Sequence, residues 1–356
     1  MHRNVRPSSF VLLPFGAAIG CALVAAAVLA DGARLAAAES STSRRREFTQ
    51  VHMGTEWRIV LYSADESIAN RAAGAAFDRV AELDRILSDY DPASELSRLS
   101  ATAGSGRAVK IGDDLWHVLR RSQELAAATD GAFDVTVGPL TKMWRSARRS
   151  KRFPPDERMA EARAAVGFEK LELDAAARTA KLAAPNMRLD LGGIAMGYAA
   201  DEALEVVTRH GIVSAMIDAS GDIVCSAPPP GETGWKIGIA PLTESKGPPS
   251  RYVRLAHSAL TTSGDAFQYV EIDGVRYSHI VDPETGRGLT TRSSVTVTAR
   301  DCLSADSLAT AVSVLGPERG RKLIATVDGA AALVVVREGE AMRTIETPGF
   351  TSEPAP

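Results

Sequence analysis

Hydrophobic residues near the start of the chain recur at the spacing of an α-helix. Between residues 65 and 91 the apolar positions step by three or four, which is the period of one helical face. These positions are Ile68, Ala72, Ala76, Val80, Leu83 and Leu87. The pattern predicts an amphipathic helix that ends near Ser88. Two shorter helices are expected over 114–129, with Gly131 as a cap, and over 156–167.

Other segments carry the signature of β-strands. The loose alternation over 48–63 predicts a strand, and residues 168–185 predict a hairpin with its turn at 174–178. Strand patterns dominate from 214 to 300, and the apolar run 331–338 predicts a late buried strand. Because helices and strands mix without strict βαβ alternation, the expected fold class is α+β, with mixed or antiparallel sheets packed against helices.

Two later helices are marked by their ends. One is expected to follow the glycine pair at 192–193 and to run to about His210, with Gly211 as its cap. The other is expected to begin at Ser304 as N-cap, with Gly316 past its end and Pro317 as its stop.

The first residues have the composition of a targeting segment. A short basic region precedes an uncharged, almost wholly apolar run over 10–30, long enough either to span a bilayer or to form a signal core. Lipidation at Cys21 is a third alternative, and all three export the protein to the bacterial periplasm or the outer face of the inner membrane. The expected organisation is a signal peptide or membrane anchor (1–38), a linker (39–47), one folded domain (48–347) and a loose tail (348–356).

Composition excludes several classes of protein. The net charge of −3 argues against a dominant nucleic-acid surface. Cys225 and Cys302 are expected to be buried thiols rather than a disulfide, and no zinc, nucleophilic-hydrolase or Walker motif is present. Five basic residues between Arg145 and Arg152 are expected on a solvated loop, with contact to anionic lipid as the alternative.

Candidate metal- or phosphate-binding residues lie at the beginning of two predicted helices. Asp306 and Thr310 lie four residues apart, so they share a helical face, and their oxygens suit a hard cation such as Mg²⁺. The alternative is an acidic residue that only favours the helix dipole. Gly192 and Gly193 allow close approach of a phosphate, or an exposed carbonyl that completes a metal site; the alternative is an ordinary glycine turn.

A tight turn follows His279, and Asp265 follows a Ser-Gly pair. His279 and Asp282 are three residues apart around that turn, so both side chains can face one pocket. Their alternative role is structural, as is that of Asp222 and Asp265, since such residues commonly stabilise turns.

Each signal is weak alone, but their order along the chain is specific. The blocks from Met53 to Gly316 together resemble the ApbE family of FAD:protein FMN transferases, over essentially the whole domain. They are "MGTEWRI", "LSDYDPASELSRLS", "DGAFDVTVGPLTKMW", "DLGGIAMGYAADEA", "ASGDIVC", "TSGDAFQYVEIDGVRYSHIVDPETGRG" and "ARDCLSADSLATAVSVLG".

The resemblance implies a reaction and its partners. It implies that Mg²⁺ assists cleavage of the FAD pyrophosphate, that FMN passes to a Thr or Ser hydroxyl of a target protein, and that AMP leaves. The implied acceptor is a flavoprotein subunit of a membrane redox complex. Two alternatives use the same pocket: an FAD pyrophosphatase that releases FMN and AMP, and an exported flavin-binding protein without turnover.

The resemblance also implies roles for residues of the matching blocks. The carbonyl of Gly193 is expected to bind Mg²⁺ together with Asp306 and Thr310. His279 is the first candidate for taking the acceptor's proton or stabilising phosphate, and Asp265 is the second. The FAD site is expected to comprise Met53, Tyr90, Ala132, Phe133, Asp134, Asp190, Met196 and Val281.

Two positions depart from the family pattern. Met196 stands where the family usually has Lys or Glu, and a thioether can pack against a ring but cannot form the ionic contact expected there. The "ASGD" at 219–222 stands where the family usually has "GGD", which is a milder change.

Overall fold

The computed structural model describes residues 43–242, 247–264 and 269–355. It divides the chain into a unit of residues 1–44 and a unit of residues 45–356, and the second unit is described below. The expected signal or anchor at 1–38 lies outside the described residues. Within the described ranges, no helix combines the length and the apolar character needed to cross a bilayer.

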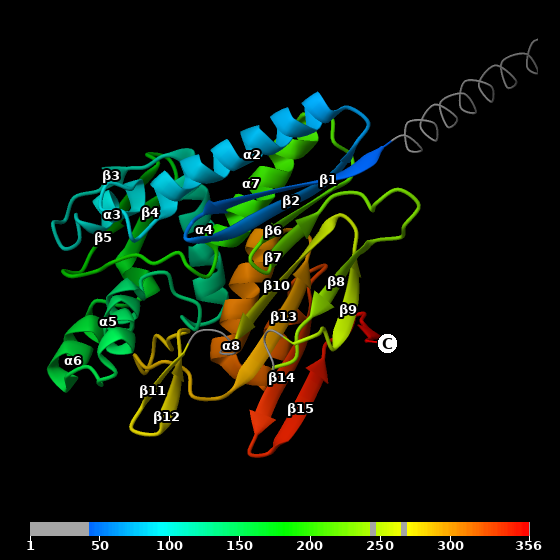
Figure 1. Cartoon of the computed structure of the whole chain (residues 1–356). Helices are drawn as coiled ribbons and strands as arrows, with labels where there is room; N and C mark the ends of the chain where they lie inside the picture. Colours follow the sequence, from blue (N-terminus) through cyan, green and yellow to red (C-terminus); the bar gives the residue numbers. More distant parts are fainter. Residues whose placement is uncertain (1–42, 243–246, 265–268, 356) are drawn as a thin grey trace, which may run out of the picture. The chain divides into compact units, whose positions relative to one another are not determined.

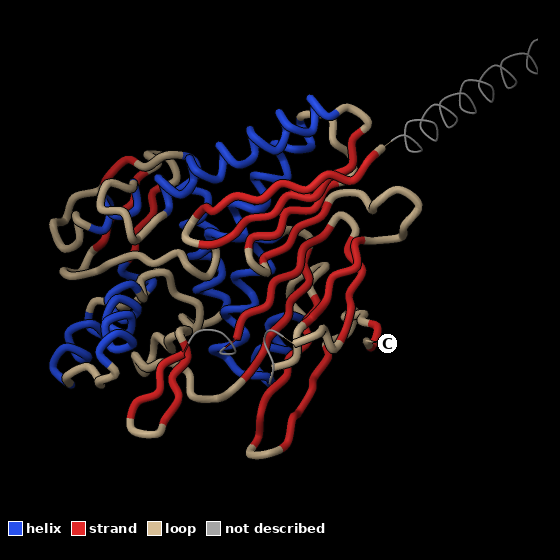
Figure 2. Tube along the Cα trace, in the orientation of Figure 1, coloured by secondary structure: helices blue, strands red, loops and turns tan. Residues whose placement is uncertain are grey.

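An eight-stranded sheet forms the centre of the fold (Figures 1 and 2). From β2 to β15, each pair of neighbouring strands in it is antiparallel. Neighbouring strands follow the order β1-β2-β6-β7-β10-β13-β14-β15. Their bounds are β1 Arg44–His52, β2 Thr55–Ser63, β6 Ala215–Ala219, β7 Asp222–Cys225, β10 Ser258–Gly264, β13 Ser293–Ala299, β14 Ala331–Glu338 and β15 Ala341–Glu346.

Three long helices cover one face of this sheet. They are α2 (Glu66–Leu87), α7 (Ala195–Arg209) and α8 (Cys302–Ile324). The main hydrophobic core fills the space between them and the sheet. The opposite face packs through Val60 and Leu260 against a small sheet of β8 (Trp235–Ile239), β9 (Arg251–Leu255) and β16 (Glu353–Pro354). The arrangement has three layers, and α7 and α8 lie side by side in the helical layer (Figure 1).

Shorter elements surround the ends of these helices. A third cluster of apolar side chains, which includes Leu140, Trp144, Tyr277 and Val281, joins α5, α6 and the hairpin β11–β12. The remaining elements are α3 Glu95–Ser100, β3 Val109–Lys110, α4 Asp113–Ala128, α5 Gly138–Ser150, α6 Asp156–Ala164, a 3₁₀ turn Phe168–Lys170, β4 Leu171–Asp174, β5 Thr179–Leu182, β11 Tyr269–Ile272 and β12 Val275–Ser278.

Most expected elements are confirmed. The α+β class is correct, and α2, α4, α6 and the hairpin β4–β5 lie within a few residues of their expected bounds. The apolar face of α2 is buried in the main core, and Asp65 caps its start by accepting the N–H groups of Ser67 and Ile68. Cys225 and Cys302 are free and buried, as expected.

The N-terminal strand pattern is corrected. Residues 44–63 form two strands rather than one, because Met53 (φ 49°) and Gly54 (φ 75°) adopt left-handed backbone angles and turn the chain between β1 and β2. β1 begins at Arg44, so it takes in the end of the segment expected to be a linker.

Three expectations in the second half are also corrected. α8 begins earlier, since Asp301 rather than Ser304 is the N-cap, and its carboxylate accepts the N–H of Ser304. The backbone breaks at Gly316 (φ 73°, ψ 174°), but Pro317 starts a further helical segment to Ile324. The C-terminal tail is not wholly loose, because Phe350 is buried and β16 pairs with β9.

Candidate functional site

The site begins at the turn that leads into α7. The Asp190 carboxylate accepts the N–H of Gly192 at 2.9 Å, and the backbone N–H of Asp190 bonds the Val135 carbonyl at 2.8 Å. The first contact is a local Asx turn, which explains why an aspartate precedes the glycine pair. The second places the expected FAD-binding segment 132–134 beside this turn. Two of the seven blocks are therefore adjacent in space.

Helix α7 presents one face to the first half of α8. A Cβ on Gly193 would lie 2.9 Å from the Thr310 hydroxyl oxygen, and one on Gly197 would lie 2.3 Å from the Cys302 carbonyl oxygen. The Gly197 N–H donates to Asp306 Oδ2 at 3.2 Å. Gly193 lies just before the start of α7 and Gly197 in its first turn, and the two approach α8 near Thr310 and near Asp306 respectively. The structure thus brings together Gly193, Asp306 and Thr310, the three expected metal ligands.

Asp201 continues this contact one turn further along α7. Its two carboxylate oxygens accept the N–H groups of Cys302 and Leu303 at 2.8 and 2.9 Å. These are N–H groups of the first turn of α8, which have no partner within the helix. Burial raises the pKa of Asp201 to about 7, although both N–H bonds oppose that shift. The start of α8 is therefore fixed by Asp201 from the neighbouring helix and by its own cap, Asp301.

Asp306 lies in a strongly acidic environment. Its side chain is buried, and burial together with the nearby Asp222 carboxylate raises its pKa well above the usual range, while the Gly197 N–H acts in the other direction. A buried carboxylate among other acidic groups is costly without a cation. Carboxylate, hydroxyl and carbonyl oxygens are the donor set that Mg²⁺ prefers, so the residues fit such an ion. Among the described residues, no group of three or more His, Cys, Asp and Glu side chains has metal-binding placement.

Asp190 belongs to a second polar cluster, which includes an arginine from α5. Arg145 donates to Asp190 Oδ2 at 2.7 Å and also to Asp89, and its guanidinium lies 4.3 Å from the centre of the Tyr90 ring. The Thr141 hydroxyl donates to the same Asp190 oxygen at 2.6 Å. Tyr90 and Asp190, both expected to bind FAD, are thus held by one side chain.

The segment 132–134 lies at the edge of the main core. Burial raises the pKa of Asp134 to about 6, although the hydroxyl and N–H of Thr136 both bond its carboxylate and act against that shift. Ala132 is half-buried, whereas the Phe133 side chain packs inside the main core. The expected contact of Phe133 with FAD therefore cannot involve much of its ring.

The loop after β12 carries His279 and Val281. His279 is exposed between buried neighbours, and Val281 belongs to the apolar cluster that also contains Trp144 of α5. The Trp144 indole N–H donates to the Gly286 carbonyl at 2.8 Å, which fixes the loop against α5. Asp265, the second candidate for the proton acceptor, lies outside the described residues.

The two methionines of the expected FAD site are half-buried. Met53 lies in the β1–β2 turn and Met196 in the first turn of α7, and both pack against the main core. The structure does not join either residue to the cluster around Asp190 or to Asp306 by a hydrogen bond or ion pair.

Sequence reasoning missed Arg145 and Asp89. The basic run 145–152 does not form the expected loop, since residues 145–150 are the last turns of α5, and Arg145 is half-buried. Leu140, Trp144 and Ala147 follow Pro139 at helical spacing and are all buried, so this pattern was the available signal.

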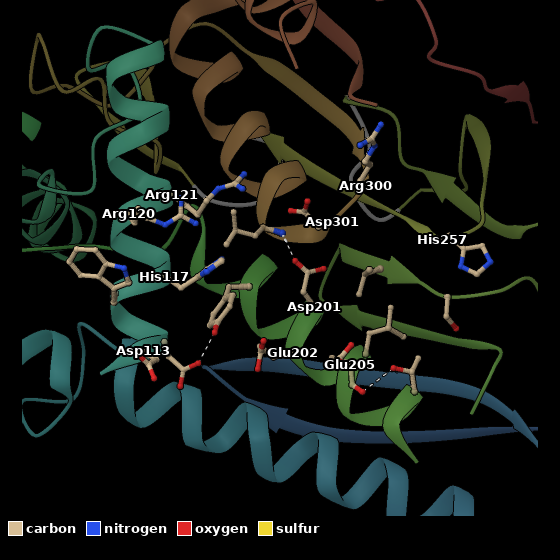
Figure 3. A pocket seen from close by; sticks show the side chains of 18 of the residues that line it. Asp113, His117, Arg120, Arg121, Asp201, Glu202, Glu205, His257, Arg300 and Asp301 are labelled. Carbon is tan, nitrogen blue, oxygen red and sulfur yellow. Dashed lines mark hydrogen bonds between the residues drawn. The ribbon is translucent and has the colours of Figure 1, made fainter. Parts of the chain in front are cut away.

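A cavity of about 920 Å³ lies elsewhere, between α4, α7 and the start of α8 (Figure 3). His117, Arg120 and Arg121 of α4 face Asp201 and Asp301 across it. Burial, followed by the charges of Arg120 and Arg121, lowers the pKa of His117. None of the residues expected to bind FAD or metal lines this cavity, so it is separate from the site that the motifs predict.

The fold and these contacts place the chain among flavin transferases. The crystal structure of the Pseudomonas stutzeri flavinyl transferase ApbE superposes with a TM-score of 0.75 at 30% identity and covers 86% of this chain and 95% of that one. The Vibrio cholerae flavin transferase ApbE gives a TM-score of 0.78 at 29% identity, with 86% and 98% covered.

The chain belongs to the ApbE family, whose model matches residues 53–334. A curated relative named FAD:protein FMN transferase, from Klebsiella pneumoniae, is 29% identical over 335 residues and covers 92% of this chain and 95% of the relative. A relative of the same name from Vibrio cholerae is 31% identical over 310 residues, with 85% and 92% covered. The family resemblance expected from the seven blocks is confirmed.

Proposed function

We propose that this protein transfers FMN from FAD to a Thr or Ser hydroxyl of a target flavoprotein and releases AMP. The observation that carries the proposal is the contact between α7 and α8, which brings Gly193 against Thr310 and Gly197 against Asp306. The relatives named FAD:protein FMN transferase support the same reaction. FAD is the substrate.

We propose Mg²⁺ as the metal, held by the Gly193 carbonyl, the Asp306 carboxylate and the Thr310 hydroxyl. When bound, such an ion neutralises charge that develops on the pyrophosphate oxygens during phosphoryl transfer. The chain's own contribution is to hold these three donors in register, because the close approach at Gly197 leaves no room for the helices to shift.

The acceptor hydroxyl must lose a proton during transfer. His279 is our first candidate for taking it, since it lies exposed in the loop after β12, which Trp144 fixes against α5, where a protein hydroxyl can reach it, and imidazole titrates near neutral pH. Asp265 is the second candidate. Ala132, Asp134, Asp190, Tyr90 and Val281 are proposed to hold FAD, together with Met53, Phe133 and Met196.

The N-terminal pattern supports an exported protein. An acceptor subunit of a membrane redox complex, on the periplasmic side of the inner membrane, is the partner that such a location implies. The apolar run 10–30 provides either a cleaved signal or an anchor to that membrane.

One assay separates the transferase from its alternatives. The purified protein is incubated with FAD and Mg²⁺, with and without a Thr-containing acceptor protein, and all components are analysed by mass spectrometry. We expect the acceptor to gain the mass of FMN while AMP appears. AMP released without an acceptor and no change in acceptor mass would instead identify a pyrophosphatase. Intact FAD in both reactions would leave only flavin binding.

A further inference from the structure

Arg145 contacts two residues expected to bind FAD, Tyr90 and Asp190, but no motif of the sequence assigns it a role. We propose that Arg145 is a positioning residue of the FAD site, which holds the Tyr90 ring and the Asp190 carboxylate in the arrangement that receives FAD. The inference rests on the proposed function, because it takes Tyr90 and Asp190 as FAD-binding residues. The role of Arg145 is inferred only from its contacts in the structure.

Arg145 connects two distant parts of the chain. Arg145 joins three residues from two segments that are about a hundred positions apart in the sequence: Asp89 and Tyr90 after α2, and Asp190 before α7. A guanidinium offers several donors in a rigid plane, so it can bond two carboxylates and still stack on a ring. A flexible ammonium cannot meet all three demands together.

Arg145 also offsets negative charge in the cluster. Asp89 and Asp190 are both buried, and burial followed by the charge of Asp190 raises the pKa of Asp89, while the charges of Arg145 and Arg188 act in the opposite direction. Arg145 donates to the Asp89 carboxylate itself, whereas Arg188 donates to the Asp89 backbone carbonyl. FAD carries a negatively charged pyrophosphate. Two buried carboxylates without a cation would repel that group, so the guanidinium makes the cluster acceptable to an anionic ligand.

The ring that Arg145 contacts is exposed. Tyr90 has 75% of its surface accessible, which is unusual for a large aromatic side chain, and Arg145 covers part of the ring. Aromatic rings stack on other planar rings with a face-to-face offset. A tyrosine fixed by a cation, with most of its surface free, is suited to stacking with a ring of FAD.

Helix α5 gives the arginine a fixed base. Trp144, the residue before Arg145, is buried and bonds the Gly286 carbonyl in the loop that follows His279. Thr141, one turn earlier, bonds Asp190. Consecutive turns of α5 therefore contact both the loop that carries His279 and the Asp190 side chain. Arg145 follows Trp144 directly, so it lies next to both contacts.

The experiment compares two arginines of the same kind. Arg79 of α2 also bonds several carboxylates, those of Glu82, Asp114 and Glu202, and its side chain has the same 20% exposure as that of Arg145. We would measure FAD affinity by titration calorimetry in the presence of a metal chelator, so that the readout does not depend on turnover. Thermal unfolding of each variant would be recorded in parallel.

We expect Arg145→Gln to weaken FAD binding by about tenfold or more, since it removes a charge-assisted, bidentate contact. Arg79→Gln should lower the unfolding temperature to a similar extent but leave FAD affinity unchanged. Arg145→Lys should restore part of the thermal stability but little of the affinity, because it keeps the charge without the planar stacking surface.

A variant with Asp89→Asn and Arg145→Gln together guards against unfolding, because it leaves no unpaired charge at Asp89, while Asp190 keeps its bonds from the Thr141 hydroxyl and the Gly192 N–H. It should fold and still bind FAD weakly. Full FAD affinity in either Arg145→Gln variant would overturn the role of Arg145 and leave the proposed function intact. Failure of the unmodified protein to bind FAD would overturn both.

Discussion

The backbone N–H of Gly197 in α7 donates a hydrogen bond to Oδ2 of Asp306 in α8 at 3.2 Å. This contact needs the two helices to lie closer than side chains normally allow, because the Gly197 Cα faces the Cys302 carbonyl directly. The proposed metal ligand Asp306 is therefore oriented by a glycine on another helix, and the geometry of the site depends on that glycine.

Gly197→Ala should separate the two helices. Its Cβ would lie 2.3 Å from the Cys302 oxygen and 2.9 Å from the Asp306 Cβ, so backbone must move. We expect a loss of stability of about 1–3 kcal/mol, as for other overpacked cores, together with loss of the Mg²⁺-dependent activity. Denaturant unfolding and the FMN transfer assay measure the two effects.

Gly74→Ala is the matched control for that substitution. Gly74 lies within α2 and is exposed, and a Cβ added there would meet no atom within 4 Å outside the helix's own backbone. Alanine favours a helix over glycine by up to about 1 kcal/mol, so this variant should be slightly more stable and fully active. Equal behaviour of the two variants would contradict the close approach at Gly197.

Asp306→Ala should abolish Mg²⁺-dependent turnover. It removes the only side-chain carboxylate of the proposed metal site. It also leaves the buried N–H of Gly197 without its acceptor, so the metal-free variant should lose about 1–3 kcal/mol of stability. We therefore expect Mg²⁺ to raise the unfolding temperature of the unmodified protein but not of this variant. Undiminished FMN transfer by the variant would exclude Asp306 from the site.

His279→Ala should lower kcat more than it lowers FAD affinity. A general base acts in the transition state, where its removal typically costs a factor of about 100 to 10,000, and contributes less to binding of the ground state. Transfer rates at saturating FAD, compared with FAD affinity from titration, separate the two. An unchanged rate would clear His279 of a catalytic role and leave Asp265 as the candidate.

The pH dependence of stability should contain a contribution from Asp134. Its pKa of about 6 in the folded protein exceeds the ordinary value of 3.8, so the folded state holds the proton to higher pH than the unfolded chain. The free energy of unfolding should fall as pH rises between these two values and level off above them. One pKa unit corresponds to about 1.4 kcal/mol, so the total is at most about 3 kcal/mol.

Asp134→Asn should remove that contribution. Both bonds from Thr136 go to the same oxygen, Oδ1, so an amide can keep them with its own oxygen. We expect the unfolding free energy of this variant to depend less on pH between about 4 and 6 than that of the unmodified protein. Parallel pH curves for the two proteins would show that Asp134 ionises normally in the folded state.

Much of the fold could be predicted because the local signals agree with the tertiary structure. The helical face of residues 68–87 is buried as the spacing requires, and the cap at Gly211 and the turn at 174–178 depend on local chemistry alone. The β1–β2 hairpin was missed because its turn at Met53 and Gly54 interrupts an otherwise continuous strand pattern.

The site was predictable in part for the same reason. Asp306 and Thr310 share a helical face by spacing, but only the family resemblance implied that Gly193, more than a hundred residues earlier, lies beside them. Neither the residues nor the resemblance pointed to the contact between Gly197 and Asp306. Arg145 was hidden in a run of basic residues, where charge obscured the buried spacing of its helix. Such a long-range pairing with Asp89 and Asp190 leaves no local signal.

The break at Gly316 divides α8 into an inner segment, residues 302–315, and an outer segment, residues 317–324. Gly320 of the outer segment lies so close to Val312 of the inner segment that a Cβ there would be 2.6 Å from the valine side chain. The outer segment therefore folds back onto the inner one. The contacts of α8 with Gly193, Gly197 and Asp201 all come from the inner segment, between Cys302 and Thr310. Substitutions at exposed positions of the outer segment, such as Glu318 or Lys322, can accordingly change the surface of the helical layer without moving Asp306 or Thr310, whereas Leu323 and Ile324 of the same segment belong to the main core.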